Sequence, residues 1–141
     1  MSIANVLTYA RARMTALGYI EHKDALNTEN VPAQAFGRTF HVLFGEPSGV
    51  TNSQDALTLD VPFAIRIFLK GKADTIAAMT DATERFDALL TEVLKIINRA
   101  TATGLVNITY RTGGIDPVAG SNDNAMVLRA EFTARTYLST R

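Results

Sequence analysis

The chain contains no cysteine and only two histidines among its 141 residues. Without cysteine there is no disulfide scaffold, no thiolate metal site and no cysteine nucleophile. Long hydrophobic runs are also absent, because the most apolar stretch, residues 61–69, contains Pro62 and Arg66 and is far too short to cross a bilayer as a helix. Residues 1–17 lack the continuous apolar run of a signal peptide. The default expectation is a cytoplasmic protein.

An excess of charge of either sign is missing too. The 14 lysines and arginines balance the 14 aspartates and glutamates, so the net charge is zero. A strong general attraction to nucleic acid or to an anionic membrane is therefore not expected. Apolar residues make up 47% of the chain and charged residues 20%, which is typical of a globular protein and excludes disorder. The length predicts a single domain over residues 1–141.

The motifs of the common active sites do not occur in the sequence. There is no glycine-rich phosphate-binding loop, no HExxH zinc motif and no Gly-x-Ser-x-Gly element. His22 is interpreted as a surface histidine and His41 as a histidine on a sheet face rather than a catalytic one. The run 122–124 is similar to a calcium loop but lacks its downstream glutamate. We therefore predict no enzyme activity, no catalytic or metal site and no cofactor.

Two segments have the periodicity of amphipathic helices. In residues 1–17 the apolar side chains recur three and four positions apart, and Gly18 is placed to end the helix. In residues 75–100 a similar stripe follows Asp74, a typical N-cap. This stripe is wide enough to pack on a sheet, which favours that arrangement over the narrow seam of a coiled coil.

Four segments alternate apolar and polar residues with the period of a β-strand: 38–44, 57–70, 105–111 and 124–138. In residues 57–70 every odd position is apolar, so the odd side chains are predicted to be buried and the even ones to face outward. Pro62 cannot donate a ladder hydrogen bond, and it predicts a sheet edge or a bulge there. A further short strand is considered near residues 19–23.

The expected order of elements is α-β-β-α-β-β. Each pair of strands is expected to form a hairpin with a long loop, at residues 45–56 and 112–123, which makes the sheet largely antiparallel. The predicted fold class is α+β, a two-layer sandwich in which two helices cover one face of a four-stranded sheet.

The other face of the sheet is predicted to be charged. Its alternating residues are Asp60, Arg66, Arg111, Arg129, Glu131 and Arg135. The simplest interpretation is a solvated face, as antiparallel sheets often have. The alternative is a surface used in assembly or lining a channel, since ten of the 14 basic residues are arginine, which favours interfaces.

Four segments carry a resemblance to a known family. They are VPFAIRIFLKG at 61–71, ERFDALLTEVLKIINRA at 84–100, LVNITYRTGG at 105–114 and NAMVLRAEFTARTYL at 124–138. In size, order of elements and general sequence pattern, nearly the whole chain resembles the tail terminator (tail completion) proteins of long-tailed bacteriophages. Alternatives left open are another phage neck, head-completion or tail tube protein, a small α+β ligand-binding domain or enzyme, and a nucleic-acid binder using the arginine-bearing face.

The resemblance implies a structural protein of the virion tail, assembled in the host cytoplasm. Its subunits would form a ring, expected to be hexameric, that caps the head-proximal end of the tail tube and stops its polymerisation. The other surface of the ring would meet the head–tail connector protein. DNA would at most pass loosely through the lumen, and no membrane, catalysis or cofactor is implied.

A set of candidate assembly residues follows from this interpretation. Phe68 and Tyr137 are expected to be exposed anchors on the otherwise polar sheet face, and the two long loops to carry further contacts. The full set is Phe68, Tyr137, Arg66, Arg129, Arg135, Pro47, Gly49, Asp116 and Pro117.

Overall fold

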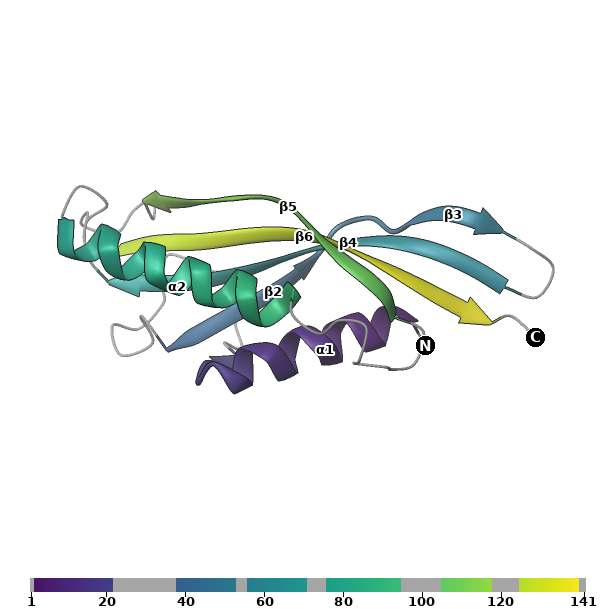
Figure 1. Cartoon of the computed structure of the whole chain (residues 1–141), viewed down its shortest axis with the longest axis horizontal. Helices are drawn as coiled ribbons and strands as arrows, with labels where there is room; N and C mark the ends of the chain where they lie inside the picture. The colour runs from purple at the N-terminus through teal and green to yellow at the C-terminus, as the bar shows by residue number, and fades with distance from the viewer. Residues whose placement is uncertain are drawn as a thin grey trace.

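The structure is a computed structural model that describes residues 2–21, 38–52, 56–70, 76–94, 105–117 and 125–139. Its elements are helix α1 (Ser2–Ala16), strands β1 (Ile20–Glu21), β2 (Thr39–Phe44), β3 (Ser48–Asn52) and β4 (Ala56–Lys70), helix α2 (Ile76–Leu94), and strands β5 (Leu105–Pro117) and β6 (Ala125–Ser139) (Figure 1). The predicted α+β class is confirmed.

The sheet has six strands rather than the four expected. Its order is β1-β2-β4-β6-β5, with β3 pairing separately along β4. Among the strands that the structure describes, the β1–β2 pair is parallel and the other pairs are antiparallel, as predicted for both hairpins. Strand β1 confirms the short strand considered near residues 19–23.

Both segments predicted to be long loops are partly strands. The segment 45–56 contains β3, and β5 continues through the first half of the segment 112–123 as far as Pro117. Each of these strands contains a register shift, between Gly49 and Thr51 in β3 and near Arg111 in β5. Strands can contain glycine and proline at bulges and at edge positions. For this reason the glycine and proline content of the two segments, which is typical of loops, did not indicate that they form strands.

Pro62 lies inside a central strand, neither at the edge of the sheet nor on a bulge. It pairs with β6 on one side. On the other side the register of β2 ends opposite Phe63 and that of β3 begins opposite Asp60. The Gly45 N–H donates to the Pro62 carbonyl at 2.8 Å between the two. The missing N–H of proline therefore falls where one neighbouring strand has ended and the next has not begun.

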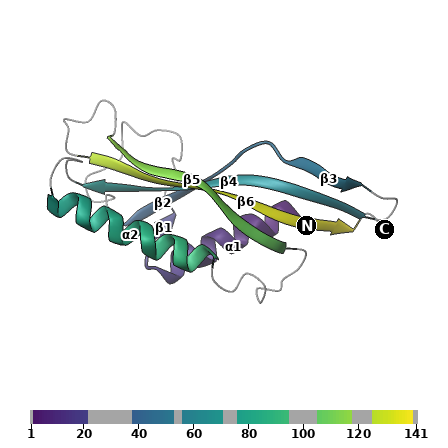
Figure 2. The same cartoon turned by 45° about the horizontal axis from the view of Figure 1, so that its top comes forward.

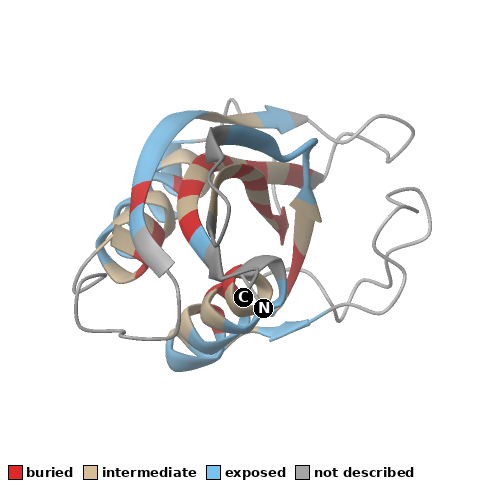
Figure 3. Ribbon diagram, turned by 90° about the vertical axis from the view of Figure 1, so that its right-hand side faces the viewer, coloured by how far each residue is buried: buried red, intermediate tan, exposed pale blue. Residues whose placement is uncertain are grey.

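The core lies between one face of the sheet and both helices, as predicted (Figure 3). The odd positions of β4 and the even positions of β6 face it, because β4 and β6 pair in register along their whole lengths. The buried members are Val6, Ala10 and Met14 of α1, Ala82, Leu89 and Val93 of α2, Phe63, Ile65, Ile67 and Leu69 of β4, and Met126, Leu128, Ala130, Phe132 and Ala134 of β6, together with Phe40 and Ile108.

Helix α2 packs on the sheet with the apolar stripe that its periodicity predicts. Ala82, Leu89 and Val93 are fully buried, and Met79, Phe86 and Leu90 are partly buried against the core. Ile76, in the first turn, is the exception and is 85% exposed. The predicted ends of this helix, at Asp74 and in residues 95–100, lie outside the described residues.

Helix α1 ends as its sequence predicts and is tied to α2. Gly18 has φ +93°, its N–H donates to the Thr15 carbonyl at 2.9 Å, and the next N–H reaches the Met14 carbonyl at 3.1 Å. This pair of hydrogen bonds, with a glycine of positive φ, is the Schellman motif that commonly ends a helix. The Tyr9 hydroxyl donates to the Val93 carbonyl at 2.9 Å, which fixes α1 against α2.

Gly113 of β5 lies where Phe86 of α2 packs against the sheet. A Cβ atom there would lie 2.5 Å from the Arg129 carbonyl oxygen and 2.7 Å from Cζ of Phe86 on α2. Phe86 also packs edge-to-face on Tyr110 at a centroid distance of 6.3 Å. The absence of a side chain at Gly113 therefore allows α2 to seat its aromatic ring on β5.

Replacing Ile65 with aspartate should abolish folding. Ile65 is fully buried at the centre of β4, opposite Ala130. An unpaired carboxylate there would cost more than the roughly 5–15 kcal/mol of a typical domain's stability. Circular dichroism and urea unfolding would measure the loss, with Thr109→Asp at an exposed position as the control. A soluble Ile65→Asp protein that melts cooperatively would contradict the assignment of the buried face.

Gly113→Ala should destabilise the protein by about 1–3 kcal/mol, because the new methyl group overlaps the Arg129 carbonyl and Phe86. Gly114→Ala is the matched control. Its Cβ would meet only the Nη2 atom of Arg129 at 3.9 Å, an ordinary contact. Urea unfolding of both variants would measure the difference, and equal stabilities would show that α2 does not depend on the space at Gly113.

Candidate assembly surfaces

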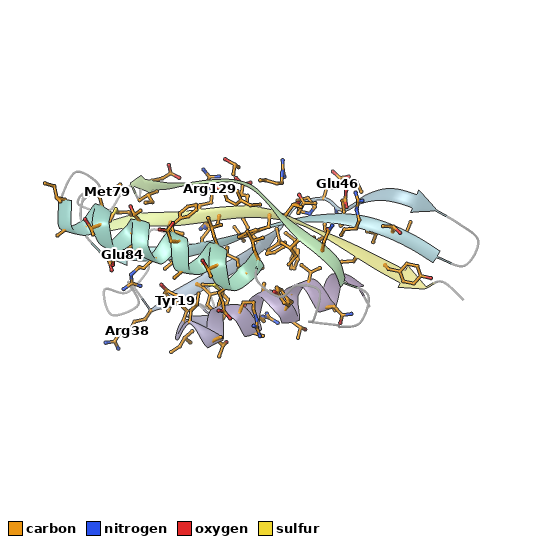
Figure 4. The ribbon with its side chains drawn as sticks, viewed as in Figure 1. Tyr19, Arg38, Glu46, Met79, Glu84 and Arg129 are labelled. Atoms are coloured by element: carbon orange, nitrogen blue, oxygen red, sulfur yellow. The ribbon has the colours of Figure 1, made fainter. Side chains whose placement is uncertain are left out.

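The face of the sheet turned away from the helices, here called the polar sheet face, carries most of the charged candidates. Figure 4 shows Arg129 on this side and Glu84 of α2 on the opposite side of the sheet. The described charged residues of the face are Asp60, Arg66, Arg111, Asp116, Arg129, Glu131 and Arg135. The prediction that Asp60, Arg66, Arg129, Glu131 and Arg135 share a face is correct. Arg111, of the same prediction, lies at a register shift of β5 on the side of Glu131. Asp116, predicted to lie in a loop, joins them on β5.

Asp60 and Arg135 form the best-defined ion pair of this face. They stand opposite each other in the β4–β6 register. The Nε and Nη2 atoms of Arg135 donate to the two carboxylate oxygens at 2.9 and 3.2 Å. This hydrogen-bonded pairing lowers the pKa of Asp60 and raises the pKa of Arg135. The pair ties β4 and β6 together on this face.

Arg129 is shared between two carboxylates. It pairs with Glu131 on its own strand. Its Nε also lies 3.7 Å from an oxygen of Asp116 on β5. The charges of all three groups are thus engaged within the sheet, and one cation shared by two carboxylates leaves a net charge of −1 in this group.

Arg66 has no such partner within the described part of the chain. In the register it stands between His41 of β2 and Arg129 of β6. Its guanidinium stacks on the Phe68 ring at 5.7 Å, and its buried Nε has no hydrogen-bond acceptor. Burial, with the neighbouring charge of Arg129, lowers the pKa of Arg66. This is a cation held among apolar and cationic neighbours.

The prediction that Phe68 is an exposed anchor is wrong. Phe68 is fully buried on the polar side of β4, and the His41 ring packs edge-to-face on it at 5.0 Å. His41 is itself fully buried on this face of the sheet. The signal in the sequence was the uninterrupted apolar run of residues 67–69, which is typical of a strand covered on both faces.

A hollow of about 320 Å³ opens where β2 ends beside Pro62. Its walls are mostly apolar, with one cation and one carboxylate among them. The lining residues are Leu43, Phe44, Gly45, Pro62, Phe63, Ala64, Arg111 and Glu131. Sequence reasoning did not find this hollow, because it arises from the interruption between β2 and β3 and not from a motif.

A second surface is the projecting end of the sheet, here called the arm, made of β3, residues 56–60 of β4 and residues 135–139 of β6. Figures 1 and 2 show these segments extending past both helices. The 15-residue strands β4 and β6 are about 50 Å long at the usual strand rise. The 19 residues of α2 cover only about 28 Å. The helices are therefore too short to cover the whole sheet.

The arm exposes apolar and small residues, among them several predicted candidates. Tyr137 is 47% exposed, as predicted, and Gly49 is exposed on β3, with Pro47 exposed just before it. On the side continuous with the core, Leu57 and Leu59 are only half-buried. These leucines would be core residues if a helix or another chain lay over them.

The candidate residues do not form one site. Asp116 pairs with Val127 and Pro117 with Met126, at the end of the sheet remote from the arm. Ten residues of β6 separate Val127 from Tyr137, about 33 Å of strand. The structure therefore places the candidates at both ends of the sheet and along its middle, on separate patches.

Within the ranges that the structure describes, no three histidine, aspartate or glutamate side chains gather into a possible metal site. The helices in those ranges are also not long and apolar enough to span a membrane.

Comparison with known proteins gives a structural likeness but no match by sequence. No family model and no curated protein matches the sequence. The fold is similar to a chain in the solved structure of the virion of a native gene transfer agent particle, with a TM-score of 0.46 and 14% sequence identity. That match covers 92% of this chain and 84% of the other. Similarity at this level assigns no function or partner to the chain.

Asp60→Asn should lower stability near neutral pH and change it little in strong acid. The pKa of Asp60 is lowered in the folded state, so its pairing stabilises the protein above the unfolded pKa of about 3.9 and is lost as the pH falls through the folded value. Urea unfolding at about pH 6 and about pH 2.5 would test this. Asp87→Asn, at an exposed position of α2, is the control. An equal loss for Asp60→Asn at both pH values would contradict the role of the pair.

Proposed function

We propose that this chain is a structural subunit of a bacteriophage tail that forms a terminator ring of six copies at the head-proximal end of the tail tube. The ring stops polymerisation of the tube and offers its other surface to the head–tail connector. This function needs no catalytic group and no cofactor. It places the protein in the virion tail, assembled from subunits made in the host cytoplasm.

The arm is the observation that carries this proposal. Half-buried Leu57 and Leu59 and exposed Tyr137 lie on strands that continue well past the helices. Exposed apolar surface and exposed strand edges of this kind promote association between chains. In a protein that functions as a monomer we expect such strands to be shorter or to be covered by another segment. A projecting part of the sheet suits contact with another protein chain. The resemblance in element order to tail terminator proteins is the reason for proposing that this contact belongs to a phage tail.

The charge distribution also favours a protein partner over DNA. Among the described arginines of the polar sheet face, Arg135 is engaged by Asp60 and Arg129 by Glu131 and Asp116, which leaves two, Arg66 and Arg111, without a carboxylate partner. A surface that holds a nucleic acid tightly needs arginines available to phosphates, and its affinity falls steeply with salt. With its net charge of zero, the chain does not repel its own copies.

A neck, head-completion or tail tube protein is the alternative within the same class of assemblies. A terminator adds as one ring to a finished tube, whereas a tube protein polymerises on its own. The two functions therefore differ in whether assembly stops after a single ring.

Purified protein should form closed rings of about six subunits, alone or when mixed with the tail tube protein of the same phage. Native mass spectrometry and negative-stain electron microscopy would measure the number of copies and the symmetry. Tyr137→Ser should fold normally and weaken the ring, since it removes an exposed apolar group of the arm. Ile20→Ser removes one from β1, outside the arm, and should assemble as the unchanged protein does.

A protein that stays monomeric and does not bind tube ends would overturn the proposal. Open-ended tubes formed by the protein alone would favour the tube alternative. Rings that are unaffected by Tyr137→Ser would show that the arm is not part of the subunit contact.

A further inference from the structure

Two cations on the polar sheet face lack partners within the described part of the chain. Arg66 stacks on Phe68, and its Nε finds no acceptor. Arg111 is exposed at the β5 register shift and forms no described ion pair. The carboxylates of the same face are already engaged, Asp60 by Arg135 and Glu131 by Arg129. The unsatisfied charge of this face is therefore positive.

These two cations flank the hollow. Arg111 lines it directly, together with Ala64 of β4. Arg66 lies two residues from Ala64 along the same strand and on the same face, about 7 Å away. The result is a mostly apolar recess lined by Arg111 and by Glu131, which Arg129 already engages, with Arg66 further along the same face of β4. Such a surface fits a ridge of small side chains carrying negative charge.

The outward side of α2 has the complementary character. Glu84 and Asp87 are exposed, stand three residues apart and form no ion pair within the described residues. Such a spacing puts both carboxylates on one side of a helix, about 5–6 Å apart. The other acids of the helix are engaged, Asp81 by Arg85 and Glu92 by Arg13. The exposed residues around the two free carboxylates are small: Ala77, Thr80, Thr83, Ala88 and Thr91.

The two complementary surfaces lie on opposite sides of the molecule. In Figure 4, Glu84 is on the helix layer and Arg129, the register neighbour of Arg66, is on the far side of the sheet. A molecule cannot join them within itself. Two copies of the chain can bring the two surfaces together. Because each contact joins one surface to a different surface, it can repeat from copy to copy, and a closed ring forms when the rotation between neighbouring copies completes a full turn.

We propose that the outward side of α2 in one copy, through Glu84 and Asp87, docks on the polar sheet face of the next copy at Arg66 and Arg111. The occupant of the sheet face is thus a second copy of this chain. The inference rests on the proposed ring function and names a contact between subunits in addition to the one proposed for the arm.

Charge exchange between the two surfaces tests the contact. Arg66→Glu alone and the pair Glu84→Lys with Asp87→Lys should each raise the protein concentration needed for assembly at least about tenfold, since like charges then face each other. An equimolar mixture of the two variants should recover assembly with alternating copies, because both kinds of contact regain opposite charges. Native mass spectrometry distinguishes such mixed rings by their mass.

The controls separate folding, general charge and function. Arg38→Glu makes the same charge change at an exposed residue that Figure 4 shows on the helix side, and it should assemble as the unchanged protein does. Circular dichroism would report whether each variant folds. If Arg66→Glu does not fold, the variant with Glu84→Lys and Asp87→Lys, which is altered only at exposed positions, tests the contact by itself.

The outcomes distinguish the two proposals. Rings of the unchanged protein that persist in either variant, or a mixture that fails to recover, would overturn this contact and leave the ring function standing. An unchanged protein that never assembles, even with tube protein, would overturn both. If Arg66→Glu forms rings normally but loses binding to a short DNA duplex, the face serves phosphates instead of a second copy.

Discussion

The structure depends on one long antiparallel pairing, that of β4 with β6. The two 15-residue strands face each other residue for residue from Ala56 opposite Ser139 to Lys70 opposite Ala125. Because side chains alternate along a strand, this single register decides which residues face the helices and which face away. Every other strand of the sheet pairs directly with one of these two, except β1, which adds to β2.

The length of that pairing also creates the surfaces available for assembly. Strands of about 50 Å cannot be covered by helices of half that length, so one end of the sheet remains without a helix. On the covered part, the helices protect only one face. The other face balances most of its charges internally, through pairs such as Asp60 with Arg135, but the described residues offer the Nε of Arg66 no acceptor. A ring of identical subunits would use both kinds of surface.

The candidate surfaces were only partly predictable from the sequence. Alternation places Arg66, Arg129 and Arg135 on one face, and this is what the structure shows. Alternation does not reveal that Phe68 is buried against His41, because a face is buried or exposed according to what lies over it. The hollow beside Pro62 depends on where β2 stops and β3 starts, and the intervening residues have the composition of an ordinary loop.

The sequence by itself determined the two amphipathic helices, the alternating long strands, the glycine-terminated end of α1 and the inward face of β4. All of these follow from local spacing and local backbone preferences. Only the tertiary structure decided the order of the strands, the pairing of individual charges and the packing of Phe86 of α2 against Gly113. These depend on contacts between segments distant in the chain, which the period of any one segment does not encode.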